Sequence, residues 1–256
     1  MDKHVVVAAA DGILRVQINR PERKNALSVA MYAQMARALT EAESDPAIRV
    51  MVIHGDPQVF TSGNDLLDFM NGAPGGEGRP VFDFLHAINA AAKPLVAAVN
   101  GPAIGIGTTM LLHCDLVYAA EGSKFQLPFV NLGLCPEAAS SLLLPRMMGY
   151  QRAAELLLLG EIFSAATAHA YGLVTEIVPN GEELNAAMAA ARKLAAKPPA
   201  SLRVTKMLLK KASSDAAWQR MQEEGEQFDQ MLRAPEAAEA FRAFFEKRPP
   251  DFSKFA

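Results

Sequence analysis

The chain has 256 residues, of which 50% are hydrophobic and 21% charged, the balance of a globular protein that buries a core. Its formal net charge of −3 provides no excess of Lys and Arg for a polyanion, so nucleic acid is not expected as a partner. Two cysteines, Cys114 and Cys135, are too few for a disulfide framework and lack the spacing of a zinc or redox motif.

The N-terminal segment, Met1–Ala10, is short and apolar and lacks the basic flank that a signal sequence requires. No later window contains the roughly 20 apolar residues needed to span a bilayer. We therefore expect a cytoplasmic protein with no membrane partner.

The first two predicted strands form a β-hairpin. Val5–Ala10 and Ile13–Ile18 flank Asp11-Gly12, a pair that readily adopts the positive φ angles of a tight turn. A polar loop over 19–27 follows, and the spacing then predicts a helix over 28–44 that is capped by its first residue, a serine. Its apolar residues fall on one stripe: Met31, Met35, Ala38, Leu39 and Ala42.

Two later apolar runs, Val50–His54 and Leu95–Val99, are short and are each followed by a glycine-rich loop, as in the buried strands of layered α/β folds. Strands and helices alternate, which predicts βα units. Between these runs the segment 71–80 is dense in Gly and Pro, and we interpret it either as a mobile surface loop or as a lid.

The chain after Leu116–Ala120 is predicted to be mainly helical. Helical spacing occurs over Glu137–Met148, Gln151–Leu159, Ser164–Tyr171, Leu184–Ala196, Ser201–Lys211, Ala216–Leu232 and Glu236–Phe245. Pro198-Pro199 marks the best boundary, between a core over 1–198 and a helical C-terminal region over 199–256. The last helices form no basic face, because Lys206, Lys210 and Lys211 are mixed with Glu223, Glu224 and Glu226.

Two glycine-containing turns each follow a strand and lead into a helix, FTSGNDL at 60–66 and NGPAIGIGTT at 100–109. Backbone N–H groups at such helix starts are free to bind an anion, so the two loops could direct two donors at one oxygen. The plainer interpretation of the first is a tight turn with Asp65 as a helix cap. The second lacks the dinucleotide and phosphate-loop fingerprints.

Glu137 lies among apolar and small residues at the predicted start of a helix. Such a carboxylate is either a first-turn charge stabilised by the helix dipole or a base in a dry pocket that raises its pKa. His113-Cys114-Asp115 contains three metal-binding residue types, but consecutive helical side chains diverge, so we expect core packing and no metal site. Ser140 and Ser141 lack the G-x-S-x-G motif of a serine hydrolase.

Five motifs together resemble, in order and spacing, the enoyl-CoA hydratase/isomerase family, the crotonases. They are NRPERKNAL at 19–27, FTSGNDL at 60–66, KPLVAAVNGPAIGIG at 93–107, CDLVYAAEGSKF at 114–125 and YGLVTEIV at 171–178. The resemblance implies an α/β fold, a crotonase/ClpP-like spiral of ββα units, with a C-terminal helical region that helps to form a homotrimer or hexamer. It also implies an acyl-CoA thioester as substrate and no separate cofactor, because coenzyme A is part of the substrate.

The resemblance also implies roles for individual residues. The two family N–H groups that hold the thioester oxygen fall on Asn64 and Ile106, and the single acid of the isomerase branch falls on Glu137. Residues that match the substrate-binding groove are Lys24, Ala26, Leu27, Ser62, Gly63, Asp65, Leu66 and Gly105, with Phe129, Leu132 and Leu134 as apolar walls around the acid. For the segment 71–80, a lid over the acyl chain and an ordinary surface loop both stay open.

Thr109 and Phe129 stand where hydratases of the family carry two glutamates, so the resemblance favours a 3,2-enoyl-CoA isomerase over a hydratase. The chemistry agrees, because one carboxylate can take a proton from C2 and return it to C4, whereas hydration also needs a group that activates water. The alternatives are an enoyl-CoA hydratase, a dienoyl-CoA or ring-epoxide isomerase with a single acid, and a non-catalytic acyl-CoA-binding scaffold.

Overall fold

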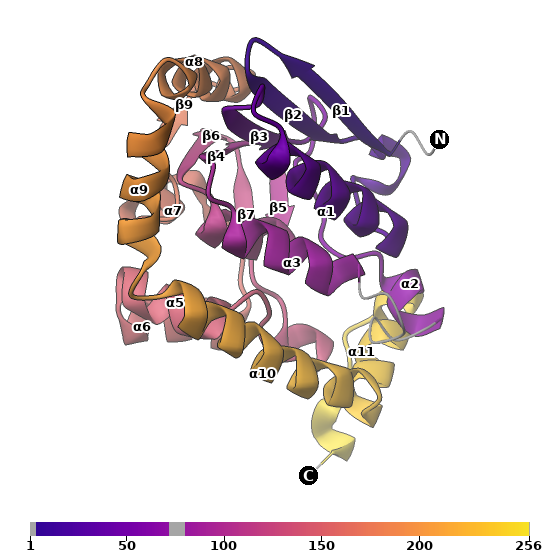
Figure 1. Ribbon diagram of the computed structural model, residues 1–256. Coiled ribbons are helices and arrows are strands. Elements are labelled where there is room, and N and C mark those ends of the chain that lie inside the picture. The colour runs from indigo at the N-terminus through magenta and orange to yellow at the C-terminus, as the bar shows by residue number, and fades with distance from the viewer. Residues whose placement is uncertain (1–3, 72–79, 256) are drawn as a thin grey trace.

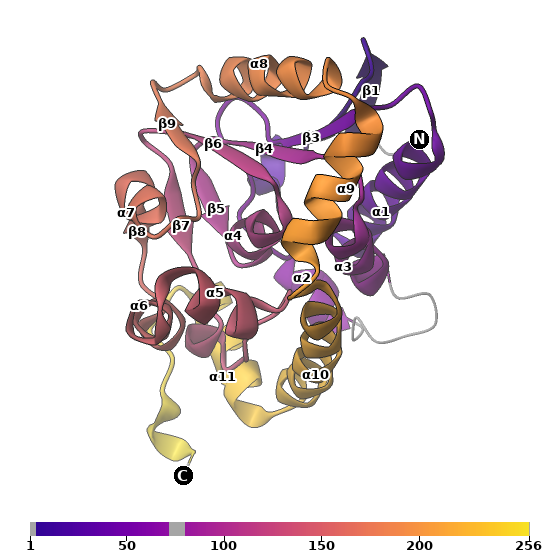
Figure 2. The ribbon, with the colours of Figure 1, turned by 60° about the vertical axis from the view of Figure 1, so that its left-hand side comes forward.

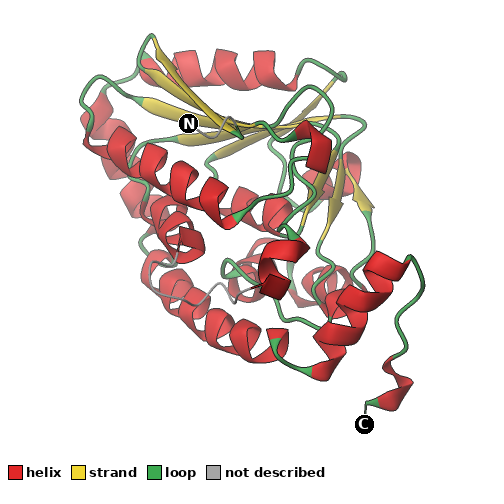
Figure 3. Ribbon diagram, turned by 90° about the vertical axis from the view of Figure 1, so that its right-hand side faces the viewer, coloured by secondary structure: helices red, strands yellow, loops and turns green. Residues whose placement is uncertain are grey.

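The computed structural model describes residues 4–71 and 80–255. Its strands are β1 (Val5–Ala10), β2 (Ile13–Ile18), β3 (Val50–His54), β4 (Leu95–Val99), β5 (Pro102–Ile104), β6 (Leu116–Ala120), β7 (Lys124–Gln126), β8 (Phe163–Ser164) and β9 (Glu176–Val178). They form a six-stranded sheet in the order β1-β2-β3-β4-β6-β9 and a three-stranded sheet in the order β5-β7-β8. The smaller sheet crosses the direction of the larger one steeply (Figure 3).

The helices are α1 (Val29–Ser44), α2 (Leu66–Asn71), α3 (Pro80–Ala90), α4 (Ile106–Thr109), α5 (Ser140–Met148), α6 (Tyr150–Ala154), α7 (Ala165–Ala170), α8 (Glu183–Ala195), α9 (Pro199–Lys210), α10 (Ser214–Leu232) and α11 (Pro235–Glu246). Helix α8 covers one face of the larger sheet, and α1 and α3 lie on the other side (Figure 1). Helix α9 runs down one side from α8 to α10 (Figure 2), and α10 packs against α3 and α5.

Strand β3 is buried on both faces of the sheet, as its continuous apolar run predicts. Because side chains alternate along a strand, Val50 and Val52 pack towards α8 with Ala187, while Met51 and Ile53 enter the larger core on the other face. Each buried side chain of this size stabilises the fold by about 1.5–3 kcal/mol relative to exposure. The larger core supports the loops that follow β3 and β4.

The N-terminal predictions are confirmed. Strands β1 and β2 pair antiparallel across a turn in which Asp11 and Gly12 have φ angles of 52° and 76°. Ser28 caps α1, because its hydroxyl accepts a hydrogen bond from the Met31 amide at 3.3 Å.

Two predicted helices differ from the structure, one helix was not predicted, and one predicted segment lies mostly outside the described residues. The helix predicted from Glu137 begins at Ser140, because two intervening alanines adopt a left-handed backbone, and the one predicted over 151–159 becomes π-helical from Glu155. Helix α3, which begins at a proline, was not predicted. Within the segment proposed as a lid, residues 72–79 lie outside the described residues.

None of the described helices has the length and apolar character needed to cross a bilayer.

Candidate active site

Backbone hydrogen bonds join the two glycine-containing loops and the segment before α1 side by side. The Leu27 amide donates to Gly63 O at 2.8 Å, and the Ile104 amide donates to Thr61 O at 3.1 Å. A Cβ atom at Gly63, where φ is 94°, would lie 2.9 Å from Ile104 O, so this approach of the loops requires glycine. The starts of α2 and α4 are thereby brought to the same region of the molecule.

Two backbone donors in these loops, the N–H groups of Asn64 and Ile106, have no acceptor among the described residues. Ile106 is the first residue of α4, where a helix provides no acceptor for its own N–H group. Asn64 forms a parallel bridge with Leu27, but the two hydrogen bonds of that bridge use the Gly63 carbonyl group and the Asp65 amide, not the Asn64 N–H group. Both donors are therefore available to a ligand.

A cavity beside the loops gathers most of the residues that the sequence predicted. Its walls include Ser62, Gly63, Asn64, Leu66, Gly105, Phe129, Leu132, Leu134 and Glu137, together with Ile104, Pro128 and Phe228. Glu137 is the only acidic residue in this set, and most of the other side chains are apolar. The cavity is thus a largely apolar space that contains one carboxyl group.

The remaining predicted site residues do not line this cavity. They are Lys24, Ala26, Leu27, Asp65 and Ile106. Lys24 is exposed, whereas the Leu27 side chain is buried in the core. The Asp65 carboxylate binds Arg20 Nη1 at 2.7 Å and accepts a hydrogen bond from the Leu67 amide at 3.1 Å, so it caps α2 as the plainer interpretation expected. A substrate-binding role for Lys24, Ala26, Leu27 and Asp65, and an oxyanion-binding role for the Ile106 N–H group, stay predictions.

Glu137 is 8% exposed, and the Oε1 atom of its carboxyl group is buried without a hydrogen-bond partner in the described part of the chain. The pKa of Glu137 is raised to about 8, and burial is the largest cause. A hydrogen bond from the Asn64 side chain acts in the opposite direction and lowers the pKa, while the charge of Glu224 raises it. The buried Tyr32 hydroxyl in turn donates to Asn64 Oδ1. A carboxyl group with a pKa near neutrality is suited to taking and returning a proton.

Sequence reasoning missed Tyr32 and Phe228 as parts of this site. Tyr32 lies beside Met31 in the apolar stripe of α1, and a phenol in a buried stripe needs a hydrogen-bond partner, which was a usable signal. No comparable signal marks Phe228, because it reaches the cavity from α10, some 90 residues along the chain from Glu137.

The backbone after Glu137 is strained. Ala138 and Ala139 both have φ angles of 58°, a left-handed conformation that costs an L residue about 1–2 kcal/mol. Ala138 O accepts a hydrogen bond at 2.8 Å from Nε2 of His113, whose pKa is lowered by burial to about 4 so that the ring is neutral. His113 is therefore a core residue, as predicted, and the described residues contain no cluster of His, Cys, Asp and Glu suited to a metal.

A second cavity, between α3 and α10, also reaches Glu137. Its walls include Val81, Phe82, Leu85, Met221, Gly225 and Asp229, and it shares Glu137 and Phe228 with the first cavity. A Cβ atom at Gly225 would lie 2.3 Å from Cζ of the Phe82 ring, so a larger residue here would require the Phe82 side chain to move. Glu137 thus contributes to the walls of both cavities.

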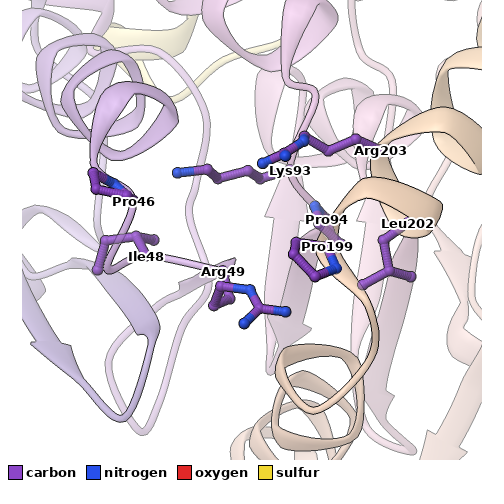
Figure 4. Close-up of a pocket in the computed structure, with 8 residues that line it drawn as sticks. All are labelled: Pro46, Ile48, Arg49, Lys93, Pro94, Pro199, Leu202 and Arg203. Carbon is purple, nitrogen blue, oxygen red and sulfur yellow. The ribbon is translucent and has the colours of Figure 1, made fainter.

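A third cavity lies away from these loops, beside the start of α9 (Figure 4). It contains three cationic side chains, Arg49, Lys93 and Arg203, and no carboxylate among its described lining residues. Lys93 points towards the end of α1, where its ammonium group donates to Ala42 O at 2.5 Å and to Asp45 O at 2.7 Å. None of the predicted site residues belongs to it.

The raised pKa of Glu137 predicts a pH-dependent stability. Its folded-state pKa of about 8 exceeds the ordinary value of 4.5, so its contribution is fully present below pH 4.5 and is lost as the pH rises through 8. We expect Glu137→Gln to match the wild type in free energy of unfolding near pH 4.5 and to exceed it by on the order of 4 kcal/mol at pH 9. Denaturant unfolding of both proteins across this range measures the difference, and a difference that does not change with pH would contradict the buried, raised carboxyl group.

The fold and the cavity together define a candidate acid–base site in an α/β protein, and comparison with known proteins shows the family to which the fold belongs. The enoyl-CoA hydratase/isomerase family matches residues 8–254. Enoyl-CoA delta isomerase 2 of Rattus norvegicus is 36% identical over 253 residues, covering 96% of this chain and 64% of the rat protein. The 2,3-dehydroadipyl-CoA hydratase of Escherichia coli K12 is 34% identical over 252 residues, covering 97% of this chain and 98% of that protein.

A solved structure, an enoyl-CoA hydratase/isomerase from Pseudoalteromonas atlantica, has a TM-score of 0.93 and 41% identity and covers 98% of this chain and 100% of that one. The chain belongs to the enoyl-CoA hydratase/isomerase family, the crotonases, and is close to its enoyl-CoA isomerases. The predicted crotonase fold is confirmed. The chain spans less than two thirds of the length of the rat relative.

Proposed function

We propose that this protein is an enoyl-CoA isomerase that moves the double bond of a 3-enoyl-CoA to the 2-position. The observation that supports this most is the buried Glu137 carboxyl group, which has one unpartnered oxygen and no second acid among the described walls of the first cavity. One group of this kind suffices to move a proton between two carbons on one face of a substrate.

The proposed reaction begins when the Glu137 carboxylate removes a proton from C2 of the thioester. The electron pair of that C–H bond delocalises over C2 to C4 and the carbonyl oxygen, which gives a dienolate. The N–H groups of Asn64 and Ile106 hold the oxygen, and each such donor typically contributes about 3–4 kcal/mol to the transition state. Glu137 then returns the proton to C4, so the double bond lies between C2 and C3 and no atom is gained or lost.

The apolar walls serve this reaction by excluding water, which would compete for the dienolate. Phe129 is buried and lines the cavity, while Thr109 is fully buried and is not part of the wall. Neither side chain supplies the second carboxylate that hydration would use. This contrast supports the isomerase over the hydratase, a choice that relatives of both kinds at similar identity leave open.

Asp229 is the specific feature that favours an alternative. It is half-buried and lines the second cavity together with Glu137, so it could act as a second acid in a hydratase or in an isomerase for a longer conjugated chain. Under the proposed single-acid reaction, Asp229→Asn is expected to retain turnover of a 3-enoyl-CoA. Loss of that turnover would favour the alternative.

The deciding experiment follows a 3-enoyl-CoA and a 2-enoyl-CoA spectrophotometrically with the same protein, with dienoyl and ring-epoxide thioesters as further substrates. We expect a double-bond shift with the first and no hydration of the second. Hydration of the 2-enoyl-CoA would contradict the isomerase assignment. Binding of both thioesters without any turnover would instead indicate a non-catalytic acyl-CoA-binding scaffold.

A homotrimer or hexamer is part of the proposal. Large apolar side chains are exposed along α9, where Val204, Met207, Leu208 and Leu209 are each more than half exposed. A second exposed group comprises Tyr150, Leu158, Leu159 and Ile162. Surfaces of this kind commonly mark protein–protein contacts. Light scattering on the purified protein is expected to give three or six times the mass of one chain, and the mass of a single chain would refute this assembly.

A further inference from the structure

Helix α10 reaches the turn that follows Glu137 through one buried carboxylate, that of Glu224, which is 6% exposed. Its Oε2 atom accepts a hydrogen bond from the Ala139 amide at 2.6 Å. Its Oε1 atom accepts from the Ser141 amide at 3.0 Å and from the Ser141 hydroxyl at 2.5 Å. Both carboxylate oxygens of Glu224 thus accept hydrogen bonds from Ala139 and Ser141, which lie just beyond Glu137 in the chain.

We propose that Glu224 is a positioning residue, which holds the Glu137 carboxyl group in the cavity by fixing Ala139 and Ser141 from the tail helix. The inference rests on the proposed function, because it concerns the reactivity of the same base. It gives the C-terminal region a role inside the active site of its own chain, separate from any role in assembly.

The turn requires such support. Ala138 and Ala139 occupy a backbone conformation that alanine rarely adopts, so the surroundings must impose it. His113 holds the carbonyl group of Ala138 from the core, and Glu224 holds the amide of Ala139 from α10. The amides at the start of α5 also lack partners within their own helix, and a carboxylate is the favoured acceptor there. Without Glu224 the turn loses one of the two side chains, His113 and Glu224, that hydrogen-bond to its backbone.

Glu224 also influences Glu137 through its charge. After burial and the Asn64 hydrogen bond, the charge of Glu224 is the next influence on the pKa of Glu137 and raises it. Burial raises the pKa of Glu224 itself, while its hydrogen bonds and the Arg220 cation lower it. The other titratable groups that face this region among the described residues are Tyr32 on α1, His113 before β6, Cys135 in the preceding loop and Asp229 on α10.

The test compares substitutions on one helix. Glu224→Gln removes the charge and, because one oxygen becomes an amide donor, loses either the Ala139 or the Ser141 contact. We expect kcat to fall by about 10- to 100-fold, with little change in the Kd of a non-reacting CoA thioester. The acid limb of the kcat/KM profile, which reports the base of the free enzyme, is expected to move to lower pH. A residue that only stabilised the fold would leave that limb in place.

Two further variants separate geometry from charge. Glu224→Asp keeps the charge but shortens the side chain, so we expect kcat to fall while the acid limb stays near its wild-type position. Glu226→Gln makes the same charge change at an exposed position of α10 and is expected to match the wild type in both respects. Thermal unfolding identifies the variants that are folded.

Wild-type kcat and a wild-type acid limb in folded Glu224→Gln would overturn the proposal. If that variant does not fold, Glu224→Asp decides, because wild-type kcat in it would overturn the proposal equally. Failure of the proposed function is recognised separately, as an absence of 3-enoyl-CoA turnover in the wild-type protein, and would overturn this inference with it.

Discussion

Glu137→Gln is expected to lower kcat for the 3-enoyl-CoA double-bond shift by about 10³-fold. Glutamine has nearly the size of glutamic acid but cannot take a proton from C2, and the described walls of the first cavity contain no other acid that could replace it. The substitution leaves the Asn64 and Ile106 donors in place, so the Kd of a CoA thioester should stay within about threefold of the wild-type value. Stopped-flow turnover and calorimetric binding measure the two quantities.

The matched control is Glu183→Gln. Glu183 is also a buried glutamate, but it lies on α8 at the other face of the large sheet, where Oε2 accepts a hydrogen bond from the Gly181 amide at 3.0 Å. We expect this variant to retain kcat even where it loses stability. Undiminished turnover in Glu137→Gln would refute the assignment of Glu137 as the base.

Ile106→Pro is expected to lower kcat/KM by about 10²–10³-fold, because proline removes one of the two N–H groups proposed to hold the thioester oxygen. Ile106 is the first residue of α4, the helical position that best tolerates proline, since its N–H group has no partner within the helix. Gly105, which precedes it, has ψ of −118° and open space where a Cβ would lie. The preceding backbone is therefore outside the α region that proline disfavours.

The control for this experiment is Ile106→Val. The Ile106 side chain is fully buried, and valine and proline both carry three side-chain carbons, so the two variants lose similar packing. Only the proline variant loses the N–H group. The two variants should have similar melting temperatures in thermal unfolding, whereas kcat/KM should be much lower in the proline variant than in the valine variant. Equal activity in folded Ile106→Pro and Ile106→Val would show that this N–H group does not stabilise the transition state.

Elements specified by neighbours along the chain were predictable. The β1–β2 hairpin follows from Asp11-Gly12, and the start of α1 follows from the Ser28 hydroxyl and the Met31 amide. Helix α3 was missed although a signal existed, because Pro80 was assigned to the Gly- and Pro-dense segment before it. Proline is favourable in the first turn of a helix, so the same residue also marks a helix start.

The start of α5 could not be predicted from local preferences. Alanine is a strong helix former, yet Ala138 and Ala139 adopt left-handed angles and delay the helix to Ser140. The contacts that accompany this backbone come from His113 and Glu224, which are distant along the chain. Propensity is a weak preference, and such tertiary contacts override it.

For the candidate site, the residues by themselves indicated the two glycine-containing loops, while the resemblance of the motifs to a known family indicated Glu137 as the acid and the absence of a second glutamate at Phe129. These features are properties of the amino-acid sequence itself, so they can be recognised without knowledge of the fold. The environment of the acid is different, because a pKa depends on the water and charges around a group. Only the tertiary structure surrounds Glu137 with Asn64 and Glu224, from loops and helices far apart in sequence, and removes the water that would otherwise keep its pKa near 4.5.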